Sequence, residues 1–134
     1  MSTFPLEIVT MDGKIFEGNV QRIILRTVHG DVAIMANHTD YCTAIGMGVA
    51  RVMMEDGKER NAACIGGMLS VIDKNVHVIP TTWEWSDDID IERAKAAKEK
   101  AEQRLADESL SKEARARAEA KLRRALVRIS TGGR

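Results

Sequence analysis

Apolar residues in the first part of the chain recur in short runs that alternate with tight-turn signals. Asp12-Gly13 and Asp56-Gly57 each separate two apolar-rich runs, and Asp73-Lys74-Asn75 separates a third pair. Asp-Gly between such runs favours a two-stranded hairpin, because glycine tolerates the positive φ that a twist-matched turn needs. The pattern therefore predicts three β-hairpins.

Two further strands are predicted at residues 20–25 and 32–35. Many short strands at this spacing are typical of sheets packed face to face. Gly66-Gly67 is interpreted as a bulge or a close backbone approach. Pro80 is expected to end the last strand, because proline cannot donate to a central ladder. Residues 1–86 are thus predicted to form an antiparallel β-sandwich.

The pattern changes at residue 87. From there to Gly132 the chain holds no glycine or proline, and strong helix formers (Ala, Glu, Lys, Arg and Leu) dominate. A helix is predicted to start here, because carboxylates suit an N-cap and first turn, where they meet exposed amides and the positive end of the helix dipole. The carboxylates are those of Asp87, Asp88, Asp90 and Glu92.

Residues 105–111 interrupt the helical pattern. Ser109 or Ser111 can cap a second helix that runs to about residue 130. Two helices joined by a short connection form an antiparallel hairpin. The predicted fold class is therefore α+β, with an N-terminal antiparallel β-sandwich in residues 1–86 and a C-terminal antiparallel two-helix hairpin in residues 87–134.

The apolar stripes of the two helices are narrow and rich in alanine. Alanine lets two helices approach closely, but each one buries little area, so the hairpin is expected to be weakly held. Two interpretations follow: a hairpin that opens, or one that is permanently docked. The predicted stripes are Ala94, Ala97, Ala101 and Leu105 on the first helix, and Ala114, Ala118, Leu122, Ala125 and Ile129 on the second.

The composition is that of a globular protein with one domain, or one domain and an appendage. Its 134 residues are 44% hydrophobic and 30% charged, which excludes a disordered chain. No apolar run is long enough to cross a bilayer, and the first residues lack the basic start and apolar core of a signal peptide. We therefore expect a location in the cytosol or on the cytosolic side of a larger assembly.

Cysteine and histidine spacing favours no metal site. Cys42 and Cys64 do not form a C-x-x-C pair, and the three histidines show no ligand spacing. Both cysteines have apolar or small neighbours, so they are expected to be buried free thiols.

Charge is distributed unevenly although the formal net charge is zero. Residues 1–86 hold 7 basic and 10 acidic side chains, whereas residues 112–134 hold 8 basic and 2 acidic ones. The end of the chain is therefore a cationic rod, and its partners are expected to be acidic or anionic.

Three segments carry a resemblance to a known family. They are LEIVTMDGKIFEG at residues 6–18, GGMLSV at residues 66–71 followed by NVHVI, and DIDIERAKAAKEKAEQRL from residue 88. In order, spacing and total length they resemble the epsilon subunit of bacterial F-type ATP synthases over the whole chain. The sequence departs from the family pattern at Met35-Ala36, where Leu-Pro is common, and at Thr39-Asp40, where Ala-Pro is common.

The resemblance implies a rotor subunit of the central stalk without catalytic residues of its own. It implies contacts with the gamma subunit, with the membrane c-ring and, when the hairpin is extended, with the alpha/beta catalytic head. In that role the chain would couple proton translocation to ATP synthesis and inhibit ATP hydrolysis through its helices. It would lie at the cytoplasmic face of the plasma membrane as a peripheral protein. By family position, Asp31 and His38 are expected to touch the ring.

The resemblance also implies a regulatory ATP site on the hairpin, with an unknown dependence on Mg²⁺. Some family members bind ATP through an Ile-Asp-x-x-Arg-Ala motif and arginines of the second helix, and residues 89–94 match that motif in full. Lys100 stands where arginine is common, and lysine lacks the two-pronged geometry of a guanidinium. The implied ATP-binding residues are Glu84, Ile89, Asp90, Arg93, Ala94, Lys100, Arg124 and Arg128.

Charge spacing supports an anion site independently of the resemblance. Arg93, Lys100 and Arg104 follow a spacing of 7 and 4 residues, and so do Arg117, Arg124 and Arg128. Each set lines one helix face, and a triphosphate between the faces would neutralise both. The alternative is a solvated helix surface with local ion pairs, such as Lys95–Glu99 and Lys98–Glu102.

Two other function classes stay open for comparison. One is a free-standing ATP sensor, and the other is a purely structural stalk subunit that binds no nucleotide. A nucleic-acid-binding module is disfavoured, because residues 87–134 contain no aromatic side chain on which a base could stack.

Overall fold

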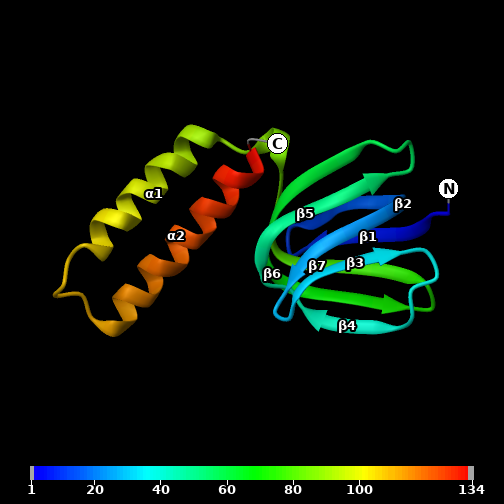
Figure 1. The fold of residues 1–134 in the computed structure, drawn as a ribbon, viewed down its shortest axis with the longest axis horizontal. Helices are drawn as coiled ribbons and strands as arrows, with labels where there is room; N and C mark the ends of the chain where they lie inside the picture. The colour runs from blue at the N-terminus through cyan, green and yellow to red at the C-terminus, as the bar shows by residue number, and fades with distance from the viewer. Residues whose placement is uncertain (1, 133–134) are drawn as a thin grey trace. The chain divides into compact units, whose positions relative to one another are not determined.

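The computed structural model describes residues 2–132, which divide into two compact units at the Trp85–Ser86 bond. The first unit contains seven β-strands, and the second contains a short 3₁₀ turn followed by two α-helices (Figure 1). None of these helices is both long enough and apolar enough to cross a membrane.

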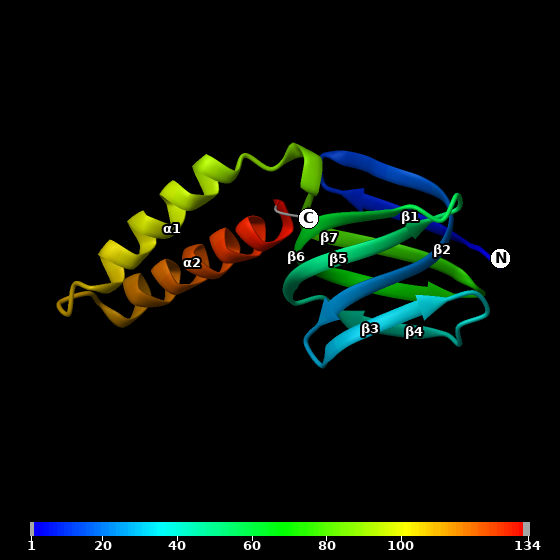
Figure 2. The ribbon, with the colours of Figure 1, turned by 45° about the horizontal axis from the view of Figure 1, so that its top comes forward.

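The strands of the first unit form a closed, flattened barrel. Hydrogen bonding runs in the order β1-β7-β6-β5-β2, and β1 pairs with β2 to close the ring (Figure 2). Two further strands are attached to this ring: β3 pairs with β2, and β4 pairs with β6. The strands are β1 (Phe4–Thr10), β2 (Gly13–Thr27), β3 (Gly30–Met35), β4 (Tyr41–Ala44), β5 (Met47–Met54), β6 (Glu59–Ile72) and β7 (Asn75–Trp85).

All three predicted hairpins are confirmed, joining β1 to β2, β5 to β6 and β6 to β7. Gly13 has φ +125° and Gly57 has φ +86°, as the Asp-Gly signals require. In the third turn Asp73 and Lys74 both have positive φ, at 50° and 68°. Two successive residues with positive φ are the geometry that matches the right-handed twist of paired strands.

The number, length and pairing direction of the strands differ from the prediction. The runs before and after Val20 form one strand, β2, which bends at a register shift between Val20 and Arg22 and so reaches both β1 and β5. Strand β4 was not predicted, because it is only four residues long. The pairing of β1 with β7 is parallel, since the strands that close the ring are not neighbours in the chain.

Pro80 does not end β7, which continues to Trp85, so that prediction was wrong. The pairing of β7 with β1 covers Val76 to Val78, and from Ile79 onward the register places only β6 beside it. Proline is tolerated in such an edge position, where one side of the strand makes no ladder.

Strand β6 changes partner at Gly66 and Gly67. Before them it pairs with β5, and after them with β4. The register of β6 with β7 is the same on both sides, so the pair does not form a bulge in that ladder. The close backbone approach was the correct interpretation, because a Cβ added at Gly67 would lie 2.5 Å from the Cα of Pro80.

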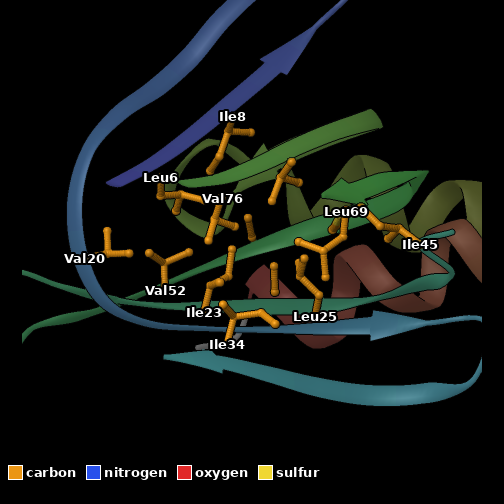
Figure 3. Close-up of a cluster of buried hydrophobic side chains, with 14 of the residues drawn as sticks. Leu6, Ile8, Val20, Ile23, Leu25, Ile34, Ile45, Val52, Leu69 and Val76 are labelled. Carbon is orange, nitrogen blue, oxygen red and sulfur yellow. The ribbon is translucent and has the colours of Figure 1, made fainter. Parts of the chain in front are cut away.

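Alternating side chains of both layers fill the sandwich. Figure 3 shows them converging on one cluster between the strands. Cys64 belongs to this core, and burial raises the pKa of its thiol to about 12. Cys42 is exposed, contrary to prediction, because it lies on the outer face of the short strand β4. The labelled core residues are Leu6, Ile8, Val20, Ile23, Leu25, Ile34, Ile45, Val52, Leu69 and Val76.

The second unit begins with the 3₁₀ turn η1 (Ser86–Asp88), followed by α1 (Ile91–Leu105) and α2 (Lys112–Gly132). Helix α1 starts four residues later than predicted, because Asp90 is extended (φ −83°, ψ 98°) and acts as its N-cap. Ser111 caps the start of α2, because its hydroxyl oxygen accepts a hydrogen bond from the Ala114 amide at 3.1 Å.

Candidate functional site

Helices α1 and α2 lie side by side and antiparallel (Figures 1 and 2). The buried side chains of the two helices are mostly alanines. Ala97 is exposed, contrary to prediction, and the half-buried Lys98 occupies the corresponding place in the stripe. Leu105, Leu122 and Ile129 are also half-buried. We call the buried stripe the alanine seam, and it consists of Ala94, Ala101, Ala114, Ala118 and Ala125.

Four cations directly precede a residue of the alanine seam. Arg93 and Lys100 precede Ala94 and Ala101 on α1, and Arg117 and Arg124 precede Ala118 and Ala125 on α2. In an antiparallel helix pair, positions that directly precede the seam on either helix point to the same side of the pair, as the facing g positions of an antiparallel coiled coil do. The seam therefore directs these four cations to one side of the hairpin, which we call the cationic flank.

The two cations of each helix have the same spacing along the flank. Arg93 and Lys100 are 7 residues apart on α1, and Arg117 and Arg124 are 7 residues apart on α2. Because an α-helix rises by about 1.5 Å per residue, each helix presents two cations about 10 Å apart along its axis on the same side of the hairpin.

The local ion pairs of α1 leave this flank without compensation. Lys98 pairs with Glu102 at 3.8 Å, as predicted, whereas Lys95 pairs with Glu92 at 3.9 Å instead of Glu99. Within residues 2–132, no carboxylate lies within ion-pair distance of the flank cations. Cations gathered on one side of the hairpin repel each other, and an anion with several oxygens would relieve that repulsion.

Other residues of the motif have packing roles. Ala94 lies in the alanine seam, and Ile89 is buried where the end of α2 meets the start of the second unit. A Cβ added at Gly132 would lie 3.2 Å from Cγ2 of Ile89. Ala94 and Ile89 therefore contribute to how α2 packs against the start of the second unit. Arg128 lies outside the motif and is half-buried on α2, one position before Ile129, and its role in a nucleotide site stays a prediction.

Glu84 belongs to the first unit, whereas the motif belongs to the second. It is half-buried in β7, where its register partner on β6 is Ala63. Its role in a nucleotide site stays a prediction.

Asp90 has a structural task that the motif alone does not reveal. Its Oδ1 accepts a hydrogen bond from the backbone amide of Arg93 at 3.0 Å, which caps α1. The Asp and Arg of the motif are therefore joined through the backbone, and the guanidinium of Arg93 stays exposed. The capping geometry holds the start of the helix, and so the position of Arg93 on the flank.

Capping and ligand binding by Asp90 are separable by substitution. Asp90→Asn is expected to leave hairpin stability nearly unchanged, because asparagine caps as well as aspartate, whereas Asp90→Ala should cost about 1 kcal/mol. Amide hydrogen exchange in α1 measures both. If Asp90→Asn loses ATP affinity while exchange is unchanged, the carboxylate contacts the ligand; a loss seen only in Asp90→Ala assigns the residue to capping.

The structure does not bring Asp31 and His38 together. Asp31 is the second residue of β3 and pairs with Arg26 at 2.6 Å, whereas His38 lies three residues beyond the other end of that strand. Asp31 and Met35 are four residues apart in an extended strand, which spans about 13 Å, so Asp31 lies near one end of β3 and His38 follows the other end. The imidazole Nδ1 of His38 lies 2.7 Å from the carbonyl oxygen of Thr39. Ring contact stays a prediction for each residue separately.

The aromatic residues near the end of β7 contact other side chains of the first unit. Trp83 is 8% exposed and belongs to the core, and its ring meets Trp85 edge-on at 5.2 Å. The guanidinium carbon of Arg60 lies 3.8 Å above the Trp85 ring. This cation–π contact was not predicted, because Arg60 and Trp85 are far apart in sequence and meet only through the β6–β7 ladder.

Within the described residues, no group of three or more His, Cys, Asp or Glu side chains is placed to hold a metal ion. The cationic flank is the grouping of charge that stands out in the second unit, and it suits an anionic ligand.

Two family models match consecutive parts of the chain. Residues 3–86 match the model described as ATP synthase, Delta/Epsilon chain, beta-sandwich domain, and residues 87–133 match the model of the long alpha-helix domain of the same chain. The chain belongs to the ATP synthase delta/epsilon family. Membership confirms the resemblance identified in the sequence and the two-part fold that it implied.

Individual relatives agree over nearly the whole length. An ATP synthase epsilon chain from Caldicellulosiruptor bescii is 40% identical over 129 residues, which cover 96% of this chain and 93% of that protein. One from Shouchella clausii is 38% identical over 129 residues, covering 96% and 94%. A chain in the mitochondrial ATP synthase of Euglena gracilis superposes with a TM-score of 0.81 at 24% identity, covering 92% of this chain and 77% of that one, and so supports the fold.

Proposed function

We propose that this chain is a rotor subunit in the central stalk of an ATP synthase, where its hairpin regulates ATP hydrolysis and responds to ATP. Family membership over the whole length supports the place in the complex. The sandwich offers a closed, rigid body for contacts with a gamma subunit and a c-ring, and the alanine-rich hairpin offers a part that can move. The chain needs no catalytic residues for this role.

The observation that carries the ATP proposal is the cationic flank. Arg93 and Arg124 lie on the same side of the hairpin and have no carboxylate partner among the described residues. A triphosphate that accepts hydrogen bonds from both guanidinium groups would join α1 to α2. Lys100 and Arg117 belong to the same flank, so Arg117 joins the candidate residues that the motif supplied.

Binding across two helices would act as a latch. A ligand that binds only the closed hairpin stabilises it by RT ln(1 + [L]/Kd), so the closed fraction rises with ATP concentration. When ATP falls, mutual repulsion along the flank favours separation of the helices, and the cationic α2 becomes available to acidic surfaces of the catalytic head. Hydrolysis would then be inhibited when ATP is scarce.

Calorimetric titration of ATP into the full chain tests this proposal. Saturable binding is expected for the wild type and should weaken at least about tenfold in Arg93→Ala and in Arg124→Ala, because each removes a charge-assisted contact. Titrations with and without Mg²⁺ determine whether the metal ion takes part. Phosphate alone should bind more weakly than ATP, since it cannot span both pairs of cations.

Arg123→Ala is the matched control. Arg123 is exposed and lies two positions before the seam residue Ala125, about 160° around the helix from it, so it is outside the flank. It should bind ATP like the wild type. If Arg123→Ala and Arg124→Ala lose the same amount of ATP affinity, the net charge of the helix and not the flank explains the binding. If the wild type does not bind ATP at millimolar concentration, the result supports the purely structural stalk subunit.

Co-purification separates a stalk subunit from a free-standing ATP sensor. A tagged chain expressed in its own cells should bring down a gamma-type subunit if it works in the stalk, whereas a sensor should be recovered without one.

The coupling ion is determined by the membrane part of the complex, and for this chain's complex we propose protons. A relative from Acetobacterium woodii, 33% identical over 106 residues, is named sodium ion specific. A peripheral location at the cytoplasmic face of the plasma membrane follows from the same proposal.

A further inference from the structure

The connection between α1 and α2 is held by one side chain of α2. Arg115 lies in the first turn of α2 and is half-buried. Its Nη1 donates to the carbonyl oxygen of Leu105 at 3.2 Å, and its Nη2 donates to the carbonyl oxygen of Asp107 at 3.0 Å. One guanidinium therefore bonds both the last residue of α1 and the loop that follows it.

These two bonds complete the C-terminal end of α1. The carbonyl groups of Glu102, Gln103 and Arg104 already accept from the amides of Ala106 and Asp107. The carbonyl of Leu105, one of the last four of the helix, has Arg115 as its donor. A positive charge at this end also meets the negative end of the helix dipole.

The loop itself is ordered around Asp107. Its carboxylate accepts from the Ser109 amide at 2.9 Å and from the Ser109 hydroxyl at 2.6 Å. These hydrogen bonds lower the pKa of Asp107, with smaller contributions from Arg104 and Arg115. Arg115 thus donates to a loop whose shape is already fixed, so its two acceptors are held at the spacing of a guanidinium fork.

Both contacts exist only when α2 folds back on α1. Leu105 and Asp107 are 10 and 8 residues before Arg115, and ten residues of continuous helix would separate the groups by about 15 Å. We propose that Arg115 is the hinge clamp of the hairpin: its bonds to Leu105 and Asp107 set the balance between the closed hairpin and one in which the helices have separated. The clamp acts without a ligand and is independent of the proposed ATP site.

Distance measurement between spin labels on the two helices tests the clamp. Labels at Lys95→Cys and Arg123→Cys occupy exposed positions on α1 and α2, in a chain that also carries Cys42→Ser. Cys64 is buried and its pKa is about 12, so it stays unlabelled in the folded protein. Pulsed electron paramagnetic resonance of the full chain without ATP then measures the distance between the two labels. The ratio of long to short distances reports how much of the hairpin is open.

Arg115→Gln is expected to raise that ratio about tenfold, which corresponds to about 1.4 kcal/mol, because two hydrogen bonds from a charged donor are lost. Lys112→Gln removes a positive charge from an exposed position of the same helix outside the cationic flank, and it should leave the ratio within about twofold. Arg115→Lys should recover only part of the effect, since an ammonium lacks the fork.

An unchanged ratio in Arg115→Gln, or equal changes in Arg115→Gln and Lys112→Gln, would overturn the proposal. Circular dichroism on the same samples excludes a trivial cause. If the long distances of Arg115→Gln appear together with a loss of helix, the residue maintains helix α2 and is no hinge clamp. Long distances with unchanged helicity support the clamp.

Discussion

Gly67→Ala is expected to abolish the stable fold of the sandwich. The added Cβ would lie 2.5 Å from the Cα of Pro80 and closer still to the carbonyl oxygen of Ile79, both of them backbone atoms of β7. Gly67 also has φ +110°, a conformation that side chains rarely adopt. Strand β7 would have to move away from β6 at the point where β6 passes from β5 to β4. We expect a loss of more than about 4 kcal/mol, a large part of the stability of a domain this size.

Gly57→Ala is the control for this prediction. Gly57 also has a positive φ of +86°, but no heavy atom lies within 4 Å of an added Cβ. Gly57→Ala should therefore lower the free energy of unfolding only by the cost of placing alanine at a positive φ, about 1–2 kcal/mol. Urea unfolding followed by tryptophan fluorescence reports on the sandwich, because Trp83 and Trp85 both belong to it. Similar losses in the two variants would contradict the argument from the close approach of β6 and β7.

Ala118→Glu is expected to separate the two helices while the sandwich stays folded. Ala118 is 2% exposed in the alanine seam, so a carboxylate there is either buried without a partner, at a cost of several kcal/mol, or forces the seam apart. Amide exchange in α1 and α2 should accelerate at least about a hundredfold, which corresponds to about 2.7 kcal/mol. Exchange in the strands should not change, because the two units are separately compact.

Ala116→Glu makes the same chemical change two positions away, on the exposed face of α2. Its exchange should match that of the wild type. If both variants lose protection equally, the thin seam does not hold the hairpin together, and helix propensity or net charge does.

The turns and the helix caps were predictable because their causes are local. Asp-Gly pairs at residues 12–13 and 56–57 imposed the positive φ that the structure shows, and Ser111 caps α2 as its side chain allows. The exact start of α1 was harder to predict, since four acidic residues compete for the cap. Only the extended backbone of Asp90 decides between them.

Features that depend on distant parts of the chain were missed or misread. Pro80 continues a strand because β1 leaves β7 after Val78, which no local pattern around the proline reveals. Arg115 looked like one more charge of a cationic rod, and its role is visible only once α2 has folded back on the end of α1. Periodicity identified the cations that line a face of each helix, but their meeting on one side of the hairpin depends on how the alanine seam orients the two helices.

The measurement that tests the central claim most directly is ATP hydrolysis by the ATP synthase complex reconstituted with this chain, over a range of ATP concentrations. We expect inhibition at low ATP that is relieved as ATP rises. Arg93→Ala should shift the relief to a higher concentration, and Arg123→Ala should not. Identical ATP dependence with the wild type, with Arg93→Ala and without the chain would contradict the proposal that the hairpin is an ATP-controlled inhibitor.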